Sequence, residues 1–273
     1  MKPVVVLKVG GSLKDTAIES LITAVQTAVA AGKSPVIVHG GGPRITEALA
    51  EIGAQLPFVG GQRLTPAAVM PIVERVLCEE VNAEIAVGLG AVGIPTRRLL
   101  RAENGLYAAP LPDMGRTSVV TSVDTTGVSA ALAAGNVPVI APVATEQATG
   151  LSCNVNADLS ASAIARALTA ERVVFFTDVE GIYSDYSTRQ RIDYATDTVL
   201  SQGLVAGRFE GGMRPKVTAV LEALQAGAEA AFVIHGGNQD AAAWAVAANI
   251  GAGMSTVRTA ALGTCVLRTS IHD

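Results

Sequence analysis

The sequence predicts an α/β protein built as a three-layer sandwich, in which a central, mainly parallel sheet carries helices on both faces. Short apolar runs, such as residues 4–7, 137–143 and 173–176, are typical of parallel strands that are buried on both faces. These runs alternate along the chain with longer segments in which apolar residues recur at helical spacing. Repeated alternation of strand and helix indicates strand–helix–strand units around one such sheet.

In the first half of the chain the order of elements follows this alternation. Gly32 ends the first expected helix, and Pro43 opens the second, because proline is tolerated in a first helical turn. Residues 58–64 suggest an irregular loop or a short hairpin. Residues 97–123, where Thr and Val alternate between turn signals, suggest a small antiparallel excursion. The expected elements are strands at 4–9, 35–38 and 137–142 and helices at 16–31, 43–52, 66–89 and 128–134.

The same alternation continues through the second half. The expected elements are helices at 159–168, 216–226 and 241–248 and strands at 172–177, 231–235 and 262–267. No Pro-, Ser- or Gly-rich linker divides the chain. We therefore expect two lobes that share one continuous sheet, an N-terminal lobe of residues 1–170 and a C-terminal lobe of residues 171–273.

Composition excludes several classes of protein. The 273 residues are 49% hydrophobic and only 16% charged, which argues against disorder. With 20 Lys and Arg against 24 Asp and Glu, the net charge of −4 argues against a nucleic-acid binder, which needs a basic face. The apolar runs are far shorter than the ~20 residues that span a bilayer, so we expect no membrane segment.

The N-terminus and the cysteines suggest a cytoplasmic protein. The first strand begins by residue 4, without the longer apolar region of a signal peptide. Cys78, Cys153 and Cys265 form no close-spaced pair, and an odd number without a framework fits a reducing compartment. We interpret all three as inert buried thiols.

Two near-matches to nucleotide-binding motifs lack the structural context that these motifs need. Residues 88–93 fit G-x-G-x-x-G, but they follow an expected helix instead of a strand, so a helix end and turn explain them. Gly32-Lys33-Ser34 resembles the end of a P-loop, but Thr27 stands where the first glycine belongs. A strand also follows there, where a P-loop requires a helix.

Glycine clusters after two strands are the stronger signal. Residues 10–12 follow the first expected strand, and residues 40–42 follow the second and run into a helix. Glycine lets backbone N–H groups approach an anion, and a helix N-terminus adds positive potential. The alternative is a pair of tight turns. Because neighbouring parallel strands end at the same edge, where open α/β sheets bind ligands, we favour phosphate or carboxylate binding.

Two lysines and two polar runs extend this hypothesis. Lys8 lies inside an apolar strand, where an unpaired charge is costly, unless it projects from the strand end toward an anion or snorkels to water. Lys216 lies in a first helical turn, which usually disfavours cations. Binding of an anion and plain solvation explain this lysine equally well.

Residues 154–158 contain three polar residues at alternate positions. A helix N-cap explains only one of these three residues. Residues 177–183 place a carboxylate and a turn after a strand, which alone is a weak nucleotide signal.

The two histidines beside glycine clusters are interpreted as structural. His39 precedes the 40–42 cluster, where a neutral imidazole capping the turn is favoured over a chemical role. His235 falls after a late strand, and we expect it to be structural or peripheral.

Taken together, these segments resemble the amino acid kinase family over nearly the whole chain. Two motifs, Gly61-Gln62-Arg63-Leu64-Thr65-Pro66 and Asn154-Val155-Asn156-Ala157-Asp158, are similar to the branch that phosphorylates N-acetyl-L-glutamate. The others are shared loosely with carbamate, aspartate, glutamate and uridylate kinases. They are Lys8-Val9-Gly10-Gly11-Ser12, His39-Gly40-Gly41-Gly42, Thr177-Asp178-Val179-Glu180-Gly181 and Gly211-Gly212-Met213-Arg214-Pro215-Lys216.

The resemblance implies the amino acid kinase fold and a transferase activity. The reaction would be ATP-dependent phosphorylation of the side-chain carboxylate of N-acetyl-L-glutamate to N-acetyl-L-glutamyl 5-phosphate and ADP, in arginine biosynthesis. The alternatives are a kinase for a related substrate, such as acetylaminoadipate, carbamate or aspartate, and a catalytically inactive ligand sensor, against which Lys8 and Lys216 argue. The N-terminal lobe would bind the amino acid and dimerise, and the C-terminal lobe would bind ATP.

The resemblance also implies catalytic roles. Lys8 and Lys216 would stabilise the transferring phosphoryl group from the two lobes, and Asp158 would hold both lysines by ion pairing. The attacking carboxylate is ionised near pH 7, so no general base is required. Arg63 would clamp the α-carboxylate of the substrate with its planar fork. Asn154 would hydrogen-bond the amino-acid portion of the substrate.

The remaining implied contacts are with phosphate and nucleotide. Backbone N–H groups of Gly41 and Gly42 would hydrogen-bond the attacking carboxylate and the phosphoryl oxygens, as in an oxyanion hole. Mg²⁺ would be held by the ATP phosphates, so we name no protein residue as a metal ligand. The residues expected to contact nucleotide or phosphate are Gly10, Gly11, Ser12, Asp178, Gly181, Gly212 and Met213.

Three departures from the family pattern matter. Gly60-Gly61-Gln62 stands where many relatives have Asp or Asn with Gly before the substrate arginine. Residues 102–121, the expected lid over the substrate, match no pattern closely, which leaves selectivity between acetylglutamate and acetylaminoadipate open. Arginine-inhibited relatives carry a helix before the first strand, whereas this strand begins by residue 4. We therefore expect a homodimer that is insensitive to arginine.

Overall fold

The computed structural model describes residues 2–10, 15–185, 187–209, 213–250 and 261–269, and its centre is a single eight-stranded sheet. The strand order is β14-β16-β15-β11-β1-β2-β8-β5, and every neighbouring pair is parallel except β15 with β16. The strands are β1 (Val4–Val9), β2 (Ser34–His39), β5 (Thr96–Leu99), β8 (Val137–Ile140), β11 (Arg172–Thr177), β14 (Tyr194–Thr196), β15 (Ala230–His235) and β16 (Thr264–Leu267). The predicted mainly parallel sheet is confirmed.

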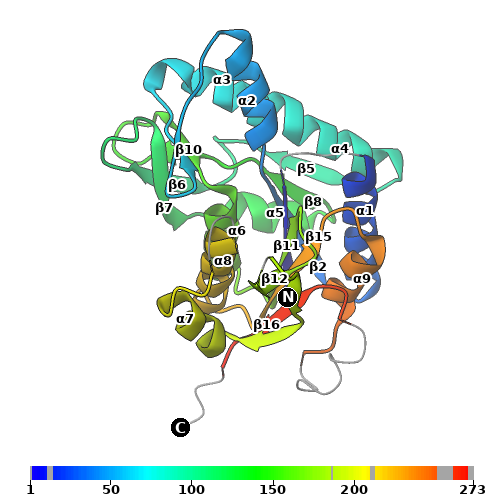
Figure 1. Ribbon diagram of the computed structural model, residues 1–273. Helices are drawn as coiled ribbons and strands as arrows, with labels where there is room; N and C mark the ends of the chain where they lie inside the picture. The colour runs from blue at the N-terminus through cyan, green and yellow to red at the C-terminus, as the bar shows by residue number, and fades with distance from the viewer. Residues whose placement is uncertain (1, 11–14, 186, 210–212, 251–260, 270–273) are drawn as a thin grey trace.

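Helices cover both faces of this sheet, as predicted. In β1, Val5, Leu7 and Val9 belong to one core, and Val4 and Val6 to the other, because successive strand residues point to opposite faces. Figure 1 shows α1 and α9 on one side of the sheet and α6 and α8 on the other. The bounds of the helices outside the 66–91 stretch are α1 (Asp15–Ala30), α2 (Gly42–Glu51), α5 (Thr126–Ala133), α6 (Ala157–Ala167), α7 (Asp197–Val205), α8 (Met213–Gln225) and α9 (Gln239–Ala247).

The long helical stretch expected at 66–89 is divided into segments. It contains a 3₁₀ turn (Ala67–Val69), α3 (Met70–Arg75), a π-helical turn η2 (Val76–Val81) and α4 (Asn82–Ala91). The near-match to a dinucleotide motif lies at the end of α4, where Gly93 has a φ of +79°. That segment is a helix end, as predicted.

Smaller sheets accompany the main sheet. Strands β6 (Leu106–Pro110), β7 (Thr117–Val123), β9 (Val143–Glu146) and β10 (Ser152–Val155) form a closed four-stranded barrel. The predicted short hairpin is β3 (Phe58–Val59) with β4 (Gln62–Arg63). Its turn residues Gly60 and Gly61 both have positive φ, which glycine adopts without strain. A second hairpin pairs β12 (Ile182–Asp185) with β13 (Gln190–Ile192).

One expected element is placed differently. Residues 97–99, assigned to the antiparallel excursion, lie in β5 of the main sheet, parallel to β8. The excursion proper is β6 with β7, which are antiparallel. β5 is an edge strand, so Arg97 and Arg98 can reach solvent, and their charges conceal the apolar pattern of a buried strand.

The sheet joins the two halves of the chain. β5, β8, β2 and β1 come from residues before 170, and β11, β15, β16 and β14 from residues after it. β1 pairs with β11 along Val5 to Lys8. The expectation of one continuous sheet is therefore confirmed, and β1 and β11 lie at its centre. Among the described residues, no helix is long and apolar enough to cross a membrane.

Candidate active site

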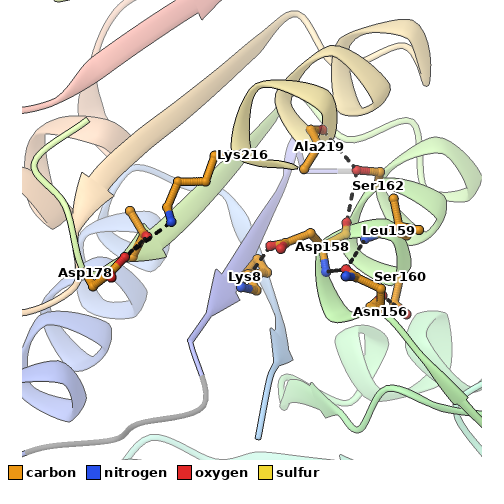
Figure 2. Close-up of polar contacts among 10 residues, drawn as sticks. Lys8, Asn156, Asp158, Leu159, Ser160, Ser162, Asp178, Lys216 and Ala219 are labelled. Atoms are coloured by element: carbon orange, nitrogen blue, oxygen red, sulfur yellow. Dashed lines mark hydrogen bonds and ion pairs between the residues drawn. The ribbon is translucent and has the colours of Figure 1, made fainter. Parts of the chain in front are cut away.

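Lys8 and Asp158 form an ion pair at the carboxyl end of the central strand. Lys8 Nζ lies 2.8 Å from Asp158 Oδ1, with both side chains largely covered. Asp158 lies in the first turn of α6, which Asn156 caps by accepting hydrogen bonds from the backbone N–H groups of Asp158 and Leu159. Figure 2 shows Lys8 pointing from β1 toward this helix start. An N-cap was the explanation offered for one of the three polar residues in this run, and that residue is Asn156.

Lys216 lies in the first turn of α8 and reaches a different carboxylate from the one expected. Its Nζ is 3.3 Å from Asp178 Oδ1, whereas Asp158 pairs with Lys8 (Figure 2). The expectation that Asp158 holds both lysines is thus not met in this structure. The reason is positional, since the start of α8 faces the end of β11, where Asp178 follows the strand.

Burial raises the pKa of Asp178, but hydrogen bonds and the Lys216 ammonium lower it by more, so its pKa lies below the ordinary range. The Thr177 hydroxyl donates one of these bonds, at 2.8 Å. Asp178 is therefore an anion near neutral pH.

Three cavities meet at Lys8. The first, called here the loop cavity, has a volume of about 290 Å³ and is bounded by the 40–42 loop, the β3–β4 hairpin and residues 154–158. The second, the strand-end cavity, has about 570 Å³ and is bounded by the ends of β1, β11 and β15. A small cavity of about 70 Å³ contains Lys8, Asp158 and Lys216 together. One ammonium group thus lies at the boundary of two larger spaces.

Arg63 lines the loop cavity in a fixed orientation. Its side chain is 6% exposed, and its guanidinium lies over the ring of Phe58, 4.5 Å from the centroid. Nη2 donates to the Gly42 carbonyl at 2.9 Å and to the Thr46 hydroxyl at 2.8 Å. Among the described residues, Nε and Nη1 have no hydrogen-bond partner. Neither nitrogen is among the buried polar atoms that lack a partner, so both are accessible. Arg63 therefore offers two donors to a planar anion in this cavity.

Asn154 is held beside Arg63 by buried hydroxyls. Its Nδ2 donates to Thr65 Oγ1 at 3.0 Å, and Thr65 in turn donates to the Arg63 carbonyl at 2.9 Å. Thr117 hydrogen-bonds both Thr65 and the Arg63 carbonyl. This network links β4 to β7 and β10, so the position of Arg63 is coupled to the four-stranded barrel.

The π-helical turn packs against the 40–42 loop. Gly41 precedes α2, and a Cβ at this position would lie 2.5 Å from Leu77 Cδ2, which belongs to the π-helical turn. A side chain here is excluded unless Leu77 moves. Glycine fits at this position without displacing the Leu77 side chain.

Other residues expected at the site are distributed as follows. Gly10 lines the strand-end cavity, and Gly41 and Gly42 line the loop cavity. Gly11, Ser12 and Gly212 lie outside the described residues. Gly181 packs against Thr264 and Arg191, and Met213 is buried at the start of α8; neither lines the three cavities.

Sequence reasoning missed several side chains at this site. Phe58, Thr65 and Thr117 fix Arg63 and Asn154, and Gln62 lines the loop cavity with a buried Oε1 that has no partner among the described residues. Thr65 lies two residues from Arg63, so strand alternation was the available signal. Thr117 is remote in sequence, and no local pattern identifies it.

His39 is buried behind the 40–42 loop. Its Nδ1 lies 2.8 Å from the Gly40 carbonyl, and its Nε2 lies 3.1 Å from Asn82 Nδ2. Burial lowers the pKa of His39 from 6.5 to about 4, because it disfavours the charged form. A neutral imidazole that caps the turn agrees with the sequence prediction. His235 is exposed beside the strand-end cavity.

The buried neutral state of His39 predicts acid sensitivity of folding. Between pH 6.5 and 4 the unfolded chain takes up a proton that the folded protein does not bind, so the free energy of unfolding decreases as the pH falls. This group alone lowers it by about 2 kcal/mol between pH 7.5 and pH 5. Urea denaturation at these two pH values measures the difference.

His39→Asn is the matched variant for this measurement, because asparagine does not titrate. The difference between the two pH values should be smaller in this variant by that amount. Equal pH dependence in the variant and the wild type would contradict the assignment. The lowered carboxyl pKa values, such as those of Asp178 and Glu171, affect stability only at lower pH.

The described residues contain no group of three or more His, Cys, Asp or Glu that could hold a metal ion. The two carboxylates of the site, Asp158 and Asp178, are each paired with a lysine. The three cysteines are buried free thiols, and burial raises the pKa of Cys78 to about 11 and of Cys265 to about 12. These thiols are unsuited to nucleophilic chemistry.

Known proteins show the same sequence pattern. Residues 3–235 match the family model described as the amino acid kinase family. An acetylglutamate kinase of Chloroflexus aurantiacus is 38% identical over 205 residues, which cover 73% of this chain and 80% of the relative. An acetylglutamate kinase of Symbiobacterium thermophilum is 36% identical over 248 residues, covering 85% and 84%.

Solved structures share the fold. N-acetylglutamate synthase from Neisseria gonorrhoeae, complexed with coenzyme A and N-acetyl-glutamate, gives a TM-score of 0.82 at 18% identity; the match covers 98% of this chain and 60% of that one. Carbamate kinase from Giardia lamblia, bound to AMP-PNP, gives a TM-score of 0.63 at 16% identity, covering 98% and 99%. At these identities the likeness shows the architecture alone.

Proposed function

The chain belongs to the amino acid kinase family, and from this premise we propose that it is an acetylglutamate kinase. It transfers the γ-phosphoryl group of ATP to the side-chain carboxylate of N-acetyl-L-glutamate. The products are N-acetyl-L-glutamyl 5-phosphate and ADP, in a step of arginine biosynthesis. A carboxylate oxygen forms the new P–O bond as the bond from the γ-phosphorus to the β–γ bridging oxygen breaks.

The observation that carries this proposal is the shared position of Lys8. It lines both the loop cavity and the strand-end cavity, and it lies with Lys216 in the small cavity between them. Phosphoryl transfer between two anions needs alignment and charge neutralisation more than covalent assistance. Two spaces that share Lys8, with Lys216 in the small cavity beside it, supply both.

The loop cavity is the proposed site of the acyl amino acid. Arg63 presents two unpaired donors to an α-carboxylate, and Asn154 lies beside it. Gln62 lines the same cavity beside Arg63. The N-terminal lobe, residues 1–170, provides these groups.

The strand-end cavity is the proposed site of the nucleotide. It is the larger of the two spaces, and Gly10, Asp178 and Gly236 line it. Lys216 pairs with Asp178, which lines this cavity, and would leave that exposed carboxylate to bind a phosphate oxygen. The C-terminal lobe, residues 171–273, provides the ends of β11 and β15 to this surface, and the N-terminal lobe provides the end of β1 and the start of α1. We also propose contacts to phosphate or nucleotide from Gly11, Ser12, Gly181, Gly212 and Met213.

The reaction requires no general base from the protein. The attacking carboxylate is ionised near neutral pH, so no proton must be removed. Asp158 instead fixes the ammonium of Lys8 at 2.8 Å, and its own position is fixed by the N-cap of α6. Backbone N–H groups at Gly41 and Gly42 would stabilise the charge that develops on the transferred oxygens.

Magnesium would be held by the ATP phosphates. The carboxylates at the site are paired with lysines, and Mg²⁺ binds substrate phosphates readily because it dehydrates reluctantly. When bound, the ion neutralises charge on the phosphate chain.

The direct test is ATP-dependent formation of an acyl phosphate, trapped as a hydroxamate by hydroxylamine. Acetylglutamate should give the highest kcat/KM, with glutamate and acetylaminoadipate as competing substrates. The curated relatives favour acetylglutamate. Faster turnover of acetylaminoadipate would replace this proposal with the related kinase activity. Absence of hydroxamate with every substrate would refute the kinase function.

Arg63→Lys is expected to weaken binding of the acyl amino acid more than it slows chemistry. Lysine keeps a positive charge but loses the planar fork and the stacking on Phe58. We expect KM for acetylglutamate to rise about 10- to 100-fold, since each 1.4 kcal/mol lost changes affinity tenfold. KM for ATP should change little, and initial rates at varied concentrations of each substrate measure both constants.

Arg44→Lys is the matched control for Arg63→Lys. Arg44 lies near the same loop but pairs with Glu80 and Glu84 on the protein surface. Its replacement should leave both KM values unchanged. Equal effects on the two KM values in Arg63→Lys would contradict the assignment of Arg63 to the amino acid.

Exposed apolar side chains and buried cysteines bear on the assembly and the location of the protein. We propose a homodimer, because Val87 on α4 is 71% exposed and Val92, which follows this helix, is 48% exposed; such apolar side chains suit contact with a second copy. Light scattering should give twice the chain mass of 27.8 kDa. We propose a cytoplasmic location, which the buried reduced cysteines support.

A further inference from the structure

A chain of hydrogen bonds runs from Arg98, which is partly exposed at the sheet edge, through buried side chains to the 40–42 loop. Arg98 on β5 donates from Nε to Asn82 Oδ1 at 3.0 Å. Asn82, the first residue of α4, places Nδ2 3.1 Å from His39 Nε2. His39, the last residue of β2, places Nδ1 2.8 Å from the Gly40 carbonyl oxygen. These bonds connect three separate segments, namely β5, α4 and the end of β2 with the loop that follows it, and His39 and Asn82 are fully buried.

The direction of every bond in this chain is fixed by its ends. Arginine can only donate, so Asn82 Oδ1 faces Arg98, and Asn82 Nδ2 is turned toward His39 and the Val139 carbonyl. His39 Nε2 must then accept. At the other end, a carbonyl oxygen can only accept, so the proton of His39 lies on Nδ1. Both ends require the same tautomer.

Arg98, which begins this chain of hydrogen bonds, is itself held in place. Arg98 Nη2 donates to the Cys78 carbonyl, which lies in the π-helical turn, and Glu79 lies 3.6 Å from the same guanidinium. The wider turn of a π-helix interrupts the regular ladder and can free a carbonyl for such a contact. Leu77, in the same turn, packs under Gly41.

The tautomer has a consequence for the loop. No described peptide is cis, and in a trans peptide the C=O and the following N–H point in opposite directions. The Gly40 carbonyl points to His39, on the buried side. The Gly41 N–H therefore points away from His39, and Gly41 lines the loop cavity. Among the described residues this N–H has no acceptor.

We propose that Arg98, Asn82 and His39 form a positioning chain that holds the Gly40–Gly41 peptide with its N–H directed at the reacting oxygens. This inference rests on the proposed kinase function. In it His39 is a positioning residue, which acts through the Gly41 N–H and touches neither substrate. A preorganised donor stabilises developing charge because it need not reorient during the reaction.

Two substitutions separate this role from simple packing. In His39→Asn the side-chain Nδ2 occupies the position of the imidazole Nδ1 and can still donate to the Gly40 carbonyl. In His39→Gln the amide reaches the position of Nε2 and faces Asn82, so donation to Gly40 is lost. Both variants replace the ring with an amide, and both lose the same titration.

The expected result is a difference in kcat. His39→Gln should lower kcat for acetylglutamate phosphorylation about 10- to 30-fold, less than loss of a direct oxyanion donor. KM for acetylglutamate and for ATP should change less than about threefold, because the donor acts mainly on the transition state. His39→Asn should keep kcat within about threefold of the wild type. Equal kcat values in the two variants would overturn the proposal.

The tautomer is measured independently of activity. Long-range ¹H–¹⁵N spectra of the uniformly ¹⁵N-labelled protein distinguish Nδ1–H from Nε2–H imidazole. The chain has only three histidines, and His39→Asn identifies the His39 signals. We expect the Nδ1–H form at pH 7, and an Nε2–H form would overturn the proposal even where His39→Gln does not fold.

Failure of the proposed function is distinguishable from failure of this inference. If the wild-type protein does not phosphorylate acetylglutamate, the kinase proposal fails, whatever the tautomer. If the wild type is active and His39 is protonated on Nε2, or the two variants have equal kcat values, the positioning chain alone fails.

Discussion

Replacing Lys8 by alanine is expected to lower kcat for acetylglutamate phosphorylation by about 10²- to 10³-fold, the range seen when one preorganised donor to developing charge is removed. Lys8 is the residue common to the loop cavity, the strand-end cavity and the small cavity between them. No second cation among the described residues lines all three. Hydroxamate formation at saturating substrates measures kcat, and thermal unfolding checks the fold.

Lys33→Ala provides a matched control for Lys8→Ala. Lys33 Nζ lies 2.8 Å from Glu171 Oε1, and its side chain is 14% exposed, against 15% for Lys8. It precedes β2, at the opposite end of the sheet from the cavities. Loss of this pair should lower the midpoint of thermal unfolding and leave kcat unchanged. Near-normal kcat in Lys8→Ala would refute the catalytic role of Lys8.

The central strands were predictable from sequence because their burial is complete. β1 and β11 have the predicted bounds, since each is an apolar run covered on both faces. The prediction was wrong for residues 97–99 of β5, an edge strand whose exposed face accepts arginine. Strands β12 to β14 and helix α7 were not predicted, because they lie mostly at the surface, where composition is weakly constrained.

Some residues of the candidate site were predictable from sequence, and others were not. Glycines and lysines that follow strands were found because topology places the ends of parallel strands together. Which carboxylate pairs with which lysine was not predictable, since it depends on the direction in which α6 and α8 start. The contacts of Thr117 and Asn82 were also missed, because each joins segments more than 40 residues apart. Such contacts have no local pattern.

Lys216→Ala is the second substitution with a large expected effect, a decrease in kcat of about 10²-fold or more. The partner of Lys216 is the Asp178 carboxylate, whose side chain is 84% exposed, and ion pairs with exposed groups contribute little to stability. Folding therefore does not account for a lysine at this helix start. KM for acetylglutamate should change less than KM for ATP, because the residue belongs to the nucleotide side.

Arg214→Ala is the control that separates position from charge. Arg214 is an exposed cation in the same first turn of α8, two residues before Lys216, and it lines none of the cavities that meet at Lys8. Both substitutions remove one positive charge near the helix N-terminus, so they have similar effects on the helix dipole. If the general field of the turn were responsible, the two variants would lose kcat equally. A large loss in Lys216→Ala alone would show that the ammonium acts from the small cavity that it shares with Lys8.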